Sequence, residues 1–174
     1  DLYHLPVAFF NTMYSKHLIV IGGGAAGFFA AVNAARLHPS LRVTILEKTG
    51  KLLSKVRVSG GGRCNVTHAC FSIQDMVLNY PRGANFLKKA FNHFFTPDTI
   101  QWFEERGVQL KTEADGRMFP VSNNSQSIID CLMREAERYD VKIQIHIAIK
   151  EIVPENGGYT LITEKRAAVT ADYV

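Results

Sequence analysis

The chain has 174 residues, of which 47% are hydrophobic and 21% are charged. This length and composition are typical of one folded domain with a real core, and they exclude a disordered chain. The net charge of +4 comes from Lys and Arg residues scattered among acidic ones, without a combined aromatic and basic motif, so we expect no nucleic-acid partner.

The first residues and the cysteines bear on the compartment. The apolar run 5–10 is too short to span a membrane and lacks the basic flank of a signal peptide, so we expect no membrane association. Because Met13 leads at once into the first predicted strand, residues 1–12 are interpreted as a misassigned start or a cloning remnant, and the domain covers 13–174. Three cysteines without C-x-x-C or paired metal-ligand spacing favour a reduced, cytoplasmic protein with no metal site.

A glycine-rich turn follows the first predicted strand, an apolar run over 17–21. Gly22, Gly24 and Gly27 fit the spacing G-x-G-x-x-G: the first makes the turn, the second lets backbone approach a pyrophosphate, and the third lets helix pack on strand. A diphosphate would then lie at a helix N-terminus, where free N–H groups and the helix dipole favour negative charge. Alone, the pattern also fits a purely local backbone turn. The same turn contains Gly23, Ala25 and Ala26.

An acidic residue ends the second predicted strand. The helix after the glycines runs to about residue 37, and the β-branched run 42–46 then ends in Glu47, which completes a βαβ unit. Glu47 follows Gly27 by twenty residues, where a carboxylate can accept hydrogen bonds from a ribose 2′-hydroxyl. The alternative is a solvated turn residue, but the spacing favours dinucleotide binding.

A second triple glycine lies within the basic stretch 49–68. Without side chains, Gly60, Gly61 and Gly62 would let backbone N–H groups reach an anion, and Arg63 and Asn65 would add directed donors. The alternative is a mobile surface loop, since glycines among basic residues also describe flexible linkers. Other basic residues in this stretch are Lys51, Lys55 and Arg57.

Cys64 lies directly after Arg63, which would lower the pKa of the thiol and suggests a redox role. No resolving partner is evident, although Cys70 is six residues away. The other interpretation, which we favour, is a small residue that fills a turn.

The rest of the chain is predicted to be helical first and then rich in strands. Helix 84–95 carries an apolar stripe, including Phe86 and Phe94, that we expect in the core. The next helix begins with Thr96 as N-cap and Pro97 in its first position. The other predicted elements are a hairpin of strands 108–111 and 117–119, helix 125–139, a third sheet strand over 141–146, and a meander of strands 148–153, 159–163 and 167–170.

At residues 22–27, 47–48, 59–67 and 115–122 the chain resembles a bacterial family of NAD(P)/FAD-dependent oxidoreductase flavoproteins. Some members are named aminoacetone oxidases, and others are reductases of bile-acid dehydroxylation. The resemblance extends from 16 to 174, and the serine–triple glycine–Arg–Cys–Asn string is its most specific part. It implies an α/β, Rossmann-like FAD/NAD(P)-binding domain of the glutathione reductase type, with a parallel sheet, an antiparallel meander and a mainly helical insertion with a small hairpin over 66–140.

The resemblance also implies the roles of individual residues. The glycine turn would hold the FAD pyrophosphate, Glu47 the adenosine ribose, and residues 59–65 would lie along the flavin, while the backbone of Ile149 would meet adenine. No residue has a convincing catalytic role, so none is predicted. The predicted cofactor-binding set is Gly22, Gly23, Gly24, Ala25, Ala26, Gly27, Glu47, Lys48, Lys55, Ser59, Gly60, Gly61, Gly62, Arg63, Cys64, Asn65 and Ile149.

Members of the family continue beyond a strand like 171–174 with a substrate-side insertion and a segment that closes over the flavin. We therefore expect an incomplete, N-terminal FAD-binding fragment, inactive alone, of an enzyme that transfers two electrons through FAD, with NAD(P)H as donor and a small-molecule substrate. One alternative is a noncatalytic nucleotide-binding or assembly module whose unfinished sheet edge pairs with a second copy. Another is an NAD-binding Rossmann domain, although a plain one would continue with further parallel βα units.

Overall fold

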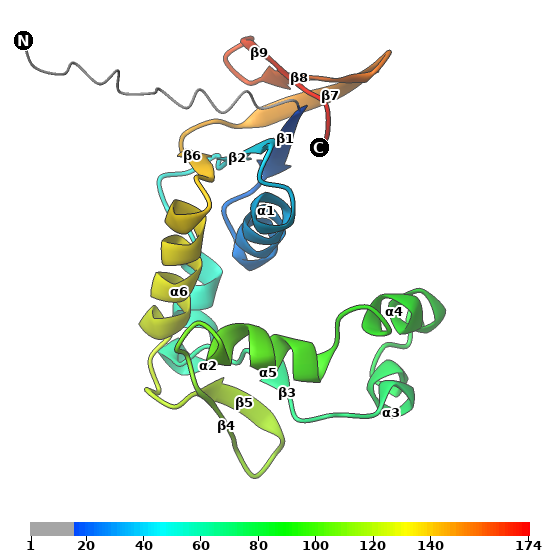
Figure 1. Ribbon diagram of the computed structural model, residues 1–174, viewed down its shortest axis with the longest axis vertical. Coiled ribbons are helices and arrows are strands. Elements are labelled where there is room, and N and C mark those ends of the chain that lie inside the picture. The colour runs from blue at the N-terminus through cyan, green and yellow to red at the C-terminus, as the bar shows by residue number, and fades with distance from the viewer. Residues whose placement is uncertain (1–15) are drawn as a thin grey trace, which may run out of the picture.

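The computed structural model describes residues 16–174, so the expectations for residues 1–12 and Met13 lie outside the described residues. Figure 1 shows a parallel sheet with its helices in the middle of the molecule, an antiparallel meander at one end, and the helical insertion with a small second sheet at the other. In the part of the chain from residue 16 onward, no helix is long and apolar enough to cross a membrane.

The parallel sheet has the strand order β1-β2-β6, which confirms the expected βαβ unit and third strand. Its strands are β1 (Lys16–Ile21), β2 (Leu41–Leu46) and β6 (Lys142–Gln144). The last strand is shorter than expected for local reasons. The Val141 amide bonds back to Ala136 at the end of the preceding helix, and His146 adopts a positive φ of 59°.

Two helices supply most of the main core: α1 (Ala25–Leu37) and α6 (Gln126–Arg138). The helix α1 buries Phe28, Ala31, Val32 and Ala35, as its small and apolar residues predict. The helix α6 buries Ile128, Ile129, Cys131, Leu132 and Ala136 along one face, which confirms the predicted amphipathic helix. The two helices pack on each other, and α1 also packs on β2.

The insertion between β2 and β6 contains the expected hairpin, to which an unexpected short strand is added in the order β3-β5-β4. Gly116, with φ of 83°, makes the predicted turn between the two hairpin strands. Before α6, its elements are α2 (Ser54–Gly62), β3 (Thr67–His68), α3 (Ile73–Leu78), α4 (Ala84–Phe91), α5 (Thr96–Glu104), β4 (Leu110–Thr112) and β5 (Arg117–Pro120).

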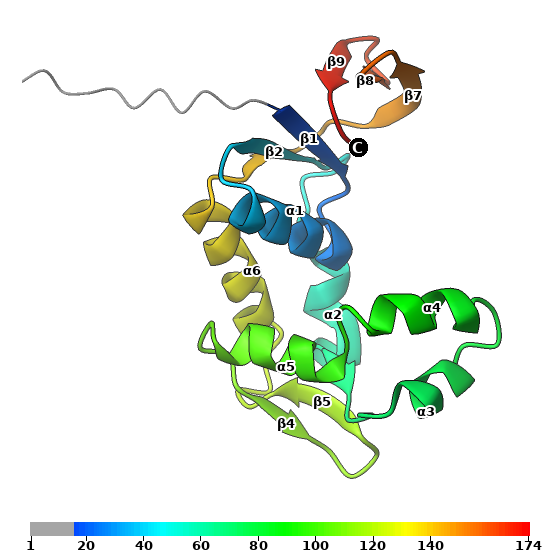
Figure 2. The same cartoon turned by 45° about the vertical axis from the view of Figure 1, so that its right-hand side comes forward.

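The apolar stripe of α4 was expected in the core, and this expectation is wrong. The helix buries none of its residues, and the side chain of Phe86 is 76% exposed. Figure 2 shows why: α4 and α3 form an arm beyond the end of α5, so most of the stripe lies outside the main core. Its rings contact near neighbours instead, with ring centroids 6.0 Å apart for Tyr80 and Phe91, and 5.2 Å apart for Phe91 and Phe95.

The start of α5 also differs from the prediction. Thr96 is the first helical residue and not the N-cap, which is Phe95. The carboxylate of Asp98 accepts a hydrogen bond from the Phe95 amide at 2.7 Å, so the acid of the first turn caps the helix. The buried Thr96 hydroxyl instead donates to the carbonyl of His68 at 3.3 Å, which ties α5 to β3.

The meander is confirmed, with β7 (Ile149–Glu155), β8 (Gly158–Thr163) and β9 (Ala168–Ala171) paired in sequence order. Gly157, with φ of 94°, makes the predicted turn between β7 and β8. The chain then returns to the parallel sheet, where Tyr173 forms a parallel bridge with Leu18 and its carbonyl accepts the Ile19 amide at 2.9 Å. Tyr173 therefore lies beside β1 on the side away from β2.

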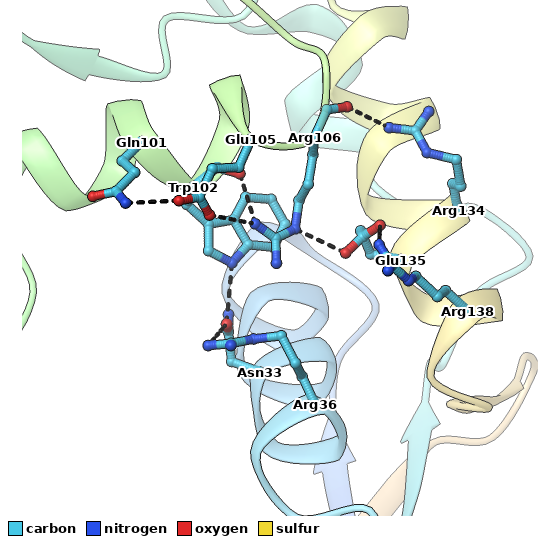
Figure 3. Close-up of polar contacts among 9 residues, drawn as sticks. All are labelled: Asn33, Arg36, Gln101, Trp102, Glu105, Arg106, Arg134, Glu135 and Arg138. Atoms are coloured by element: carbon cyan, nitrogen blue, oxygen red, sulfur yellow. Dashed lines mark hydrogen bonds and ion pairs between the residues drawn. The ribbon is translucent and has the colours of Figure 1, made fainter.

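A buried polar network holds α1, α5 and α6 together (Figure 3). The Arg106 guanidinium donates to the carboxylate of Glu135, which is 2% exposed, at 2.8 Å, and lies over the Trp102 ring at 4.1 Å from its centroid. The Trp102 indole in turn donates to Asn33 on α1 at 3.0 Å. The ion pair is thus joined to a helix that carries the glycine turn.

Candidate cofactor site

The glycine turn between β1 and α1 has the backbone that the sequence predicts. Gly22 adopts φ of 108°, and a Cβ atom on Gly27 would lie 1.9 Å from the Gly22 carbonyl oxygen, so neither position tolerates a side chain. Gly24 is different, because its φ of −93° is an ordinary one and a Cβ there would meet nothing within 4 Å. The turn therefore leaves open space in front of Gly24, where a ligand's phosphates could approach the backbone.

The first turn of α1 faces this space. The first amide of α1 to bond back within the helix is that of Phe28, which donates to Gly24 at 3.0 Å, so the preceding amides have no partner inside the helix. Ala25 and Ala26 are exposed, and the turn contains no acidic residue. Uncompensated N–H groups and the positive end of the helix dipole make this end of α1 suited to an anion.

Glu47 is bonded to the glycine turn. One carboxylate oxygen accepts the Gly23 amide at 2.8 Å, and the other accepts the amide and hydroxyl of Thr49, both at 2.8 Å. The Gly23 amide, followed by the Thr49 amide, lowers the pKa of the Glu47 carboxyl below its ordinary value. Glu47 is therefore an ionised, oriented acceptor with lone pairs left for ribose hydroxyls.

Position 23 also requires glycine, although the G-x-G-x-x-G spacing leaves this position unspecified. A Cβ atom there would lie 2.6 Å from the Leu52 side chain and 3.2 Å from that of Glu47. The Gly23 carbonyl also accepts the amide of the buried Leu53 at 2.8 Å. The glycine turn is thus held against the segment that leads into α2.

The second glycine stretch is not a mobile loop, so that alternative is wrong. It begins as a helix, and the left-handed backbone of Gly60, Gly61 and Gly62 then reverses the chain. A Cβ on Gly60 would lie 2.7 Å from the Phe119 ring, and the Gly62 carbonyl accepts the Ser125 amide at 2.8 Å. The glycine turn is therefore held in place by β5 on one side and by the start of α6 on the other.

Arg63 and Asn65 use their donors inside the protein. The Arg63 guanidinium lies 4.0 Å from the Phe119 ring centroid, donates to the Gly60 carbonyl at 3.3 Å and forms an ion pair with Glu113. The Asn65 amide nitrogen donates to the carbonyls of Thr67 at 2.9 Å and Met118 at 3.2 Å. Both side chains hold the turn in shape, and their role as ligand donors stays a prediction.

Cys64 does not have the environment of a redox thiol. It is buried, and burial raises the pKa of its thiol, whereas Arg63 was expected to lower it. The guanidinium does not activate the thiol because it is directed to Glu113 and Phe119. The structure therefore supports the interpretation of Cys64 as a small residue that fills a turn, here with φ of 63°.

A cavity of about 540 Å³ opens between the first turns of α1 and the helices α2, α5 and α6. It brings together predicted residues from two distant parts of the sequence. They are Ala25, Ala26, Lys55, Ser59, Cys64 and Asn65. The remaining wall is mainly apolar and includes Phe29 and Phe103, for which the sequence predicts no role in a site. No local pattern distinguishes a cavity wall from a filled core, so these residues had no signal of their own.

The other predicted residues lie towards the opposite end of the site. Ile149 begins β7 and packs against the small cluster that contains Leu46, and the neighbouring Ile147 amide donates to the Glu47 carbonyl at 2.9 Å. Lys48 is exposed beside Glu47. The structure thus groups Glu47, Lys48 and Ile149 at one side of the glycine turn and the cavity residues at the other. Among residues 16–174, no three His, Cys, Asp or Glu side chains are grouped to hold a metal.

Comparison with known proteins identifies the family. The model of the HI0933-like protein Rossmann domain matches residues 16–174. The chain belongs to this family. Its fold is that of a Rossmann domain, which confirms the fold class and the family resemblance inferred from the sequence.

This HI0933-like chain also matches longer proteins with assigned activities. It is 28% identical over 142 residues to the 3-dehydro-bile acid delta(4,6)-reductase of Clostridium scindens, covering 82% of the chain and 34% of that protein. It is 29% identical over 141 residues to the ribosomal RNA dihydrouridine synthase of Haemophilus influenzae, covering 81% of the chain and 33% of that protein. The chain therefore spans about a third of the length of the curated relatives it matches.

Solved structures share the fold at lower identity. The 3-ketosteroid-delta4-(5alpha)-dehydrogenase of Rhodococcus jostii RHA1, in complex with 4-androstene-3,17-dione, matches with a TM-score of 0.62 and 16% identity, over 95% of the HI0933-like chain and 46% of that structure. THI4 of Thermovibrio ammonificans matches with a TM-score of 0.59 and 13% identity, over 94% of the chain and 56% of that structure. At these identities the likeness concerns the fold alone.

Proposed function

We propose that this chain binds FAD as part of an oxidoreductase that transfers two electrons through the flavin. The observation that carries the proposal is the continuous path from Glu47, across the open glycine turn, to the cavity beside Lys55 and Ser59. An extended dinucleotide fits this order of an acid, a phosphate cradle and a pocket. The cradle is chemically suited to a diphosphate, because it offers backbone donors and space at Gly24 without an acidic side chain.

Different residues would bind different parts of the cofactor. The amides of the first α1 turn bind the pyrophosphate, and Glu47 accepts hydrogen bonds from the adenosine ribose while Gly23 keeps its carboxylate oriented. Lys55 adds a positive charge at the cavity wall. When bound, FAD supplies the electron transfer, and the protein supplies position and electrostatics.

We also propose that NAD(P)H delivers the electrons and that the substrate of the whole protein is a small molecule. A delta(4,6)-reductase and a synthase of a dihydro product both deliver hydrogen to their substrates, which supports a reductive direction. Anaerobic addition of NADH and NADPH to the FAD-loaded protein tests the donor. Bleaching of the flavin absorbance is the expected result, and a flavin that stays oxidised with both contradicts it.

An RNA substrate is the second candidate, because the relatives from Haemophilus influenzae and Escherichia coli are both named ribosomal RNA dihydrouridine synthases at 29% identity. It competes with our expectation of no nucleic-acid partner, which stays a prediction. Titration with ribosomal RNA fragments and with bile-acid-like steroids discriminates the two. Saturable RNA binding without steroid binding would favour the second candidate.

The cysteines and the sheet edge bear on the cellular compartment and on the assembly state of the protein. We propose a cytoplasmic protein, which the free thiols of Cys64, Cys70 and Cys131 support because reduced cysteines are typical of that compartment. We also propose a homo-oligomer that forms through the unfinished edge of the parallel sheet. Sedimentation over a range of concentrations tests this assembly, and a monomer throughout would reject it.

Calorimetric titration with FAD, ADP and NAD tests the proposal against its rivals. We expect FAD to bind more tightly than ADP, and NAD to bind weakly. Stronger binding of NAD would instead favour an NAD-binding Rossmann domain. A chain that binds none of the three would favour the noncatalytic assembly module.

A further inference from the structure

The tip of the arm formed by α3 and α4 exposes large apolar side chains. This tip comprises residues 78–89, from the last residue of α3 to the middle of α4. Leu78 is 80% exposed, Phe86 is 76% exposed, and Tyr80 in the connecting loop is also exposed. The loop lies at the free end of the arm, away from the parallel sheet (Figure 2). Single exposed apolar residues are normal on a protein surface, whereas a projecting group of them marks a surface that binds a partner.

Three basic side chains accompany this apolar group. Arg82, Lys88 and Lys89 are exposed, and none of them forms an ion pair with another residue in the described range 16–174. Between Asp75 and Asp98 the sequence contains no acidic residue. The tip is therefore an apolar surface with a positive charge that no neighbouring acid in the sequence balances.

The positions of the two kinds of side chain are related. Phe86 and Lys89 are three residues apart in α4 and both are exposed, so they share one face of the helix. A lysine on such a face can extend its charged end beyond the apolar side chain beside it. The face thus offers an apolar group in the middle and a cation at its margin.

The backbone of the tip is held in place by internal contacts. Gly83, with φ of 82°, lets the chain reverse between the two helices, and its carbonyl accepts the Leu87 amide at 2.9 Å. On the other side of the loop, the Asn79 amide donates to the Met76 carbonyl at 3.1 Å. The apolar side chains are thus presented on an ordered backbone, which lowers the entropy cost of binding.

We propose that the tip of the arm binds reversibly to the surface of an anionic lipid bilayer. Leu78 and Phe86 enter the apolar zone below the headgroups, and the three cations lie at the lipid phosphates. Surface binding of this kind requires no spanning helix. The inference does not depend on FAD binding. It competes with the expectation of no membrane association, which rested on the short apolar run 5–10.

The size and charge of the tip favour a bilayer over a second copy of the chain. Three partly exposed side chains present roughly 400 Å² of apolar surface, whereas a stable protein interface buries about 800 Å² on each partner. Two tips in contact would also bring like charges together. A bilayer requires no complementary shape, and its negative headgroups lie directly above an apolar layer.

RNA is a poorer match as well. It would satisfy the three cations, but the side chain of Leu78 has neither a ring to stack on a base nor a group to form a hydrogen bond. The most exposed apolar residue of the tip would therefore stay in water.

Co-sedimentation with lipid vesicles tests the proposal in the unmodified chain. We expect vesicles that contain phosphatidylglycerol to bind at least about ten-fold more tightly than vesicles of phosphatidylcholine alone, because each cation near an anionic surface contributes about five-fold. Added salt should weaken the binding, since it screens the charges. Equal binding to both kinds of vesicle, or no binding to either, overturns the proposal.

A charge variant shows whether the tip is responsible. Lys88→Gln/Lys89→Gln should bind anionic vesicles about ten-fold more weakly or worse. The matched control is Lys150→Gln/Lys165→Gln, which removes the same charge from exposed positions of the meander region. Equal losses in both double variants would mean that the net charge of the chain causes the binding, and they overturn the proposal.

An apolar variant tests insertion. Leu78 and Leu37 are the last residues of α3 and α1, and they are 80% and 60% exposed, so replacing either should leave the fold intact. Leu78→Ser should weaken vesicle binding by about five-fold or more, because a buried apolar contact with lipid is lost. Leu37→Ser is the control and should bind normally. Equal affinity of the two variants contradicts insertion.

Fluorescence reports the depth of the tip. Trp102, the one tryptophan of the chain, is buried away from the arm tip, so the unmodified protein provides the reference signal. The added tryptophan of Phe86→Trp should be quenched by vesicles with brominated acyl chains, and Trp102 should not. An unquenched signal in vesicle-bound Phe86→Trp overturns the proposal. So does a tip that binds ribosomal RNA fragments or a second copy of the chain but no vesicles.

Discussion

The backbone amide of Gly23 donates a 2.8 Å hydrogen bond to the carboxylate of Glu47, so the glycine turn and the acid at the end of β2 are bonded directly to each other. The middle glycine of the triple sequence, which the motif leaves unspecified, makes this contact. The carboxylate that is expected to bind ribose is therefore oriented by the turn that is expected to bind pyrophosphate. This coupling means that one substitution should affect both stability and cofactor binding.

Replacing the carboxylate tests this coupling. In Glu47→Gln, one of the two oxygens that accept backbone amides becomes an NH₂ group. This group is itself a donor, so it cannot accept the hydrogen bond of the backbone amide that it faces. We expect a loss of about 1–2 kcal/mol in the free energy of unfolding and weaker FAD binding. Urea unfolding and calorimetric titration measure the two effects. Glu151→Gln, at an exposed position on β7, is the control, and equal stability of both variants would refute the coupling.

The same hydrogen bonds predict a response to acid. Because they lower the pKa of Glu47 in the folded state, the unfolded chain binds the proton first as the pH falls. The stability that Glu47 contributes is complete above its ordinary value near 4.5 and is lost as the pH falls through the lower folded value. Urea unfolding between neutral and acid pH should show a smaller decline in Glu47→Gln than in the unmodified protein. Parallel declines would contradict the prediction.

Gly24 allows cofactor binding to be removed without disturbing the fold. Its φ of −93° suits any residue, and a Cβ there meets open space, so Gly24→Val should fold with a cost of at most about 1 kcal/mol from the changed N-cap. The valine would occupy the space in which a pyrophosphate approaches the backbone. We expect a loss of FAD and ADP affinity of about ten-fold or more. Thermal unfolding and calorimetry check both parts.

The control for Gly24→Val is Ala30→Val, which places the same isopropyl side chain at an exposed position farther along α1. It should keep full affinity. FAD binding by Gly24→Val as tight as that of this control would show that the cofactor does not approach the turn.

The parts of the site that sequence predicts are those fixed by local backbone. Gly22 and Gly27 are required by one turn and the helix that follows it, so their spacing alone is informative. The partners of Arg63 could not be predicted, because Glu113 and Phe119 belong to a hairpin some fifty residues later. From the sequence alone, an arginine that is available to a ligand cannot be distinguished from one that is used in internal contacts.

In the helices, too, local features are predictable and contacts with distant segments are not. Periodicity correctly predicts that α4 has an apolar face, but it does not say what covers that face, and Phe86 is exposed. In α2, the three glycines fit either an anion cradle or a mobile loop, whereas the bond that fixes the turn comes from Ser125 in a later segment. The cavity is the least predictable feature, since it depends on how α1, α5 and α6 pack and not on any one of them.

The buried pair of Arg106 and Glu135 should be a main source of stability between helices. Removing one partner in Arg106→Met leaves the carboxylate of Glu135 buried without its closest cation, so we expect a loss of about 3–5 kcal/mol in urea unfolding. The exposed pair of Lys16 and Asp172 provides the control, because solvent screens an exposed ion pair and Lys16→Met should therefore change the stability much less than Arg106→Met. The double variant Arg106→Met/Glu135→Leu should recover part of the loss. A double variant as unstable as the sum of both single changes would argue against a coupled pair.

His17 should make the stability of the sheet depend on pH near neutrality. Its Nδ1 atom accepts from Arg42 at 2.9 Å and its Nε2–H group donates to Thr44 at 2.9 Å, an arrangement that requires a neutral ring. Burial, followed by the charge of Arg42, lowers the pKa of His17, and these effects outweigh the opposing effects of the Thr170 backbone and of the Asp172 charge. The unfolded chain therefore binds the proton first, and stability should decrease as the pH falls from about 6.5 through the lower folded value. Urea unfolding at a series of pH values should show this slope in the unmodified protein and in His93→Gln, an exposed-site control, but a reduced slope in His17→Gln. Equal slopes in all three proteins would show that His17 is not the group responsible.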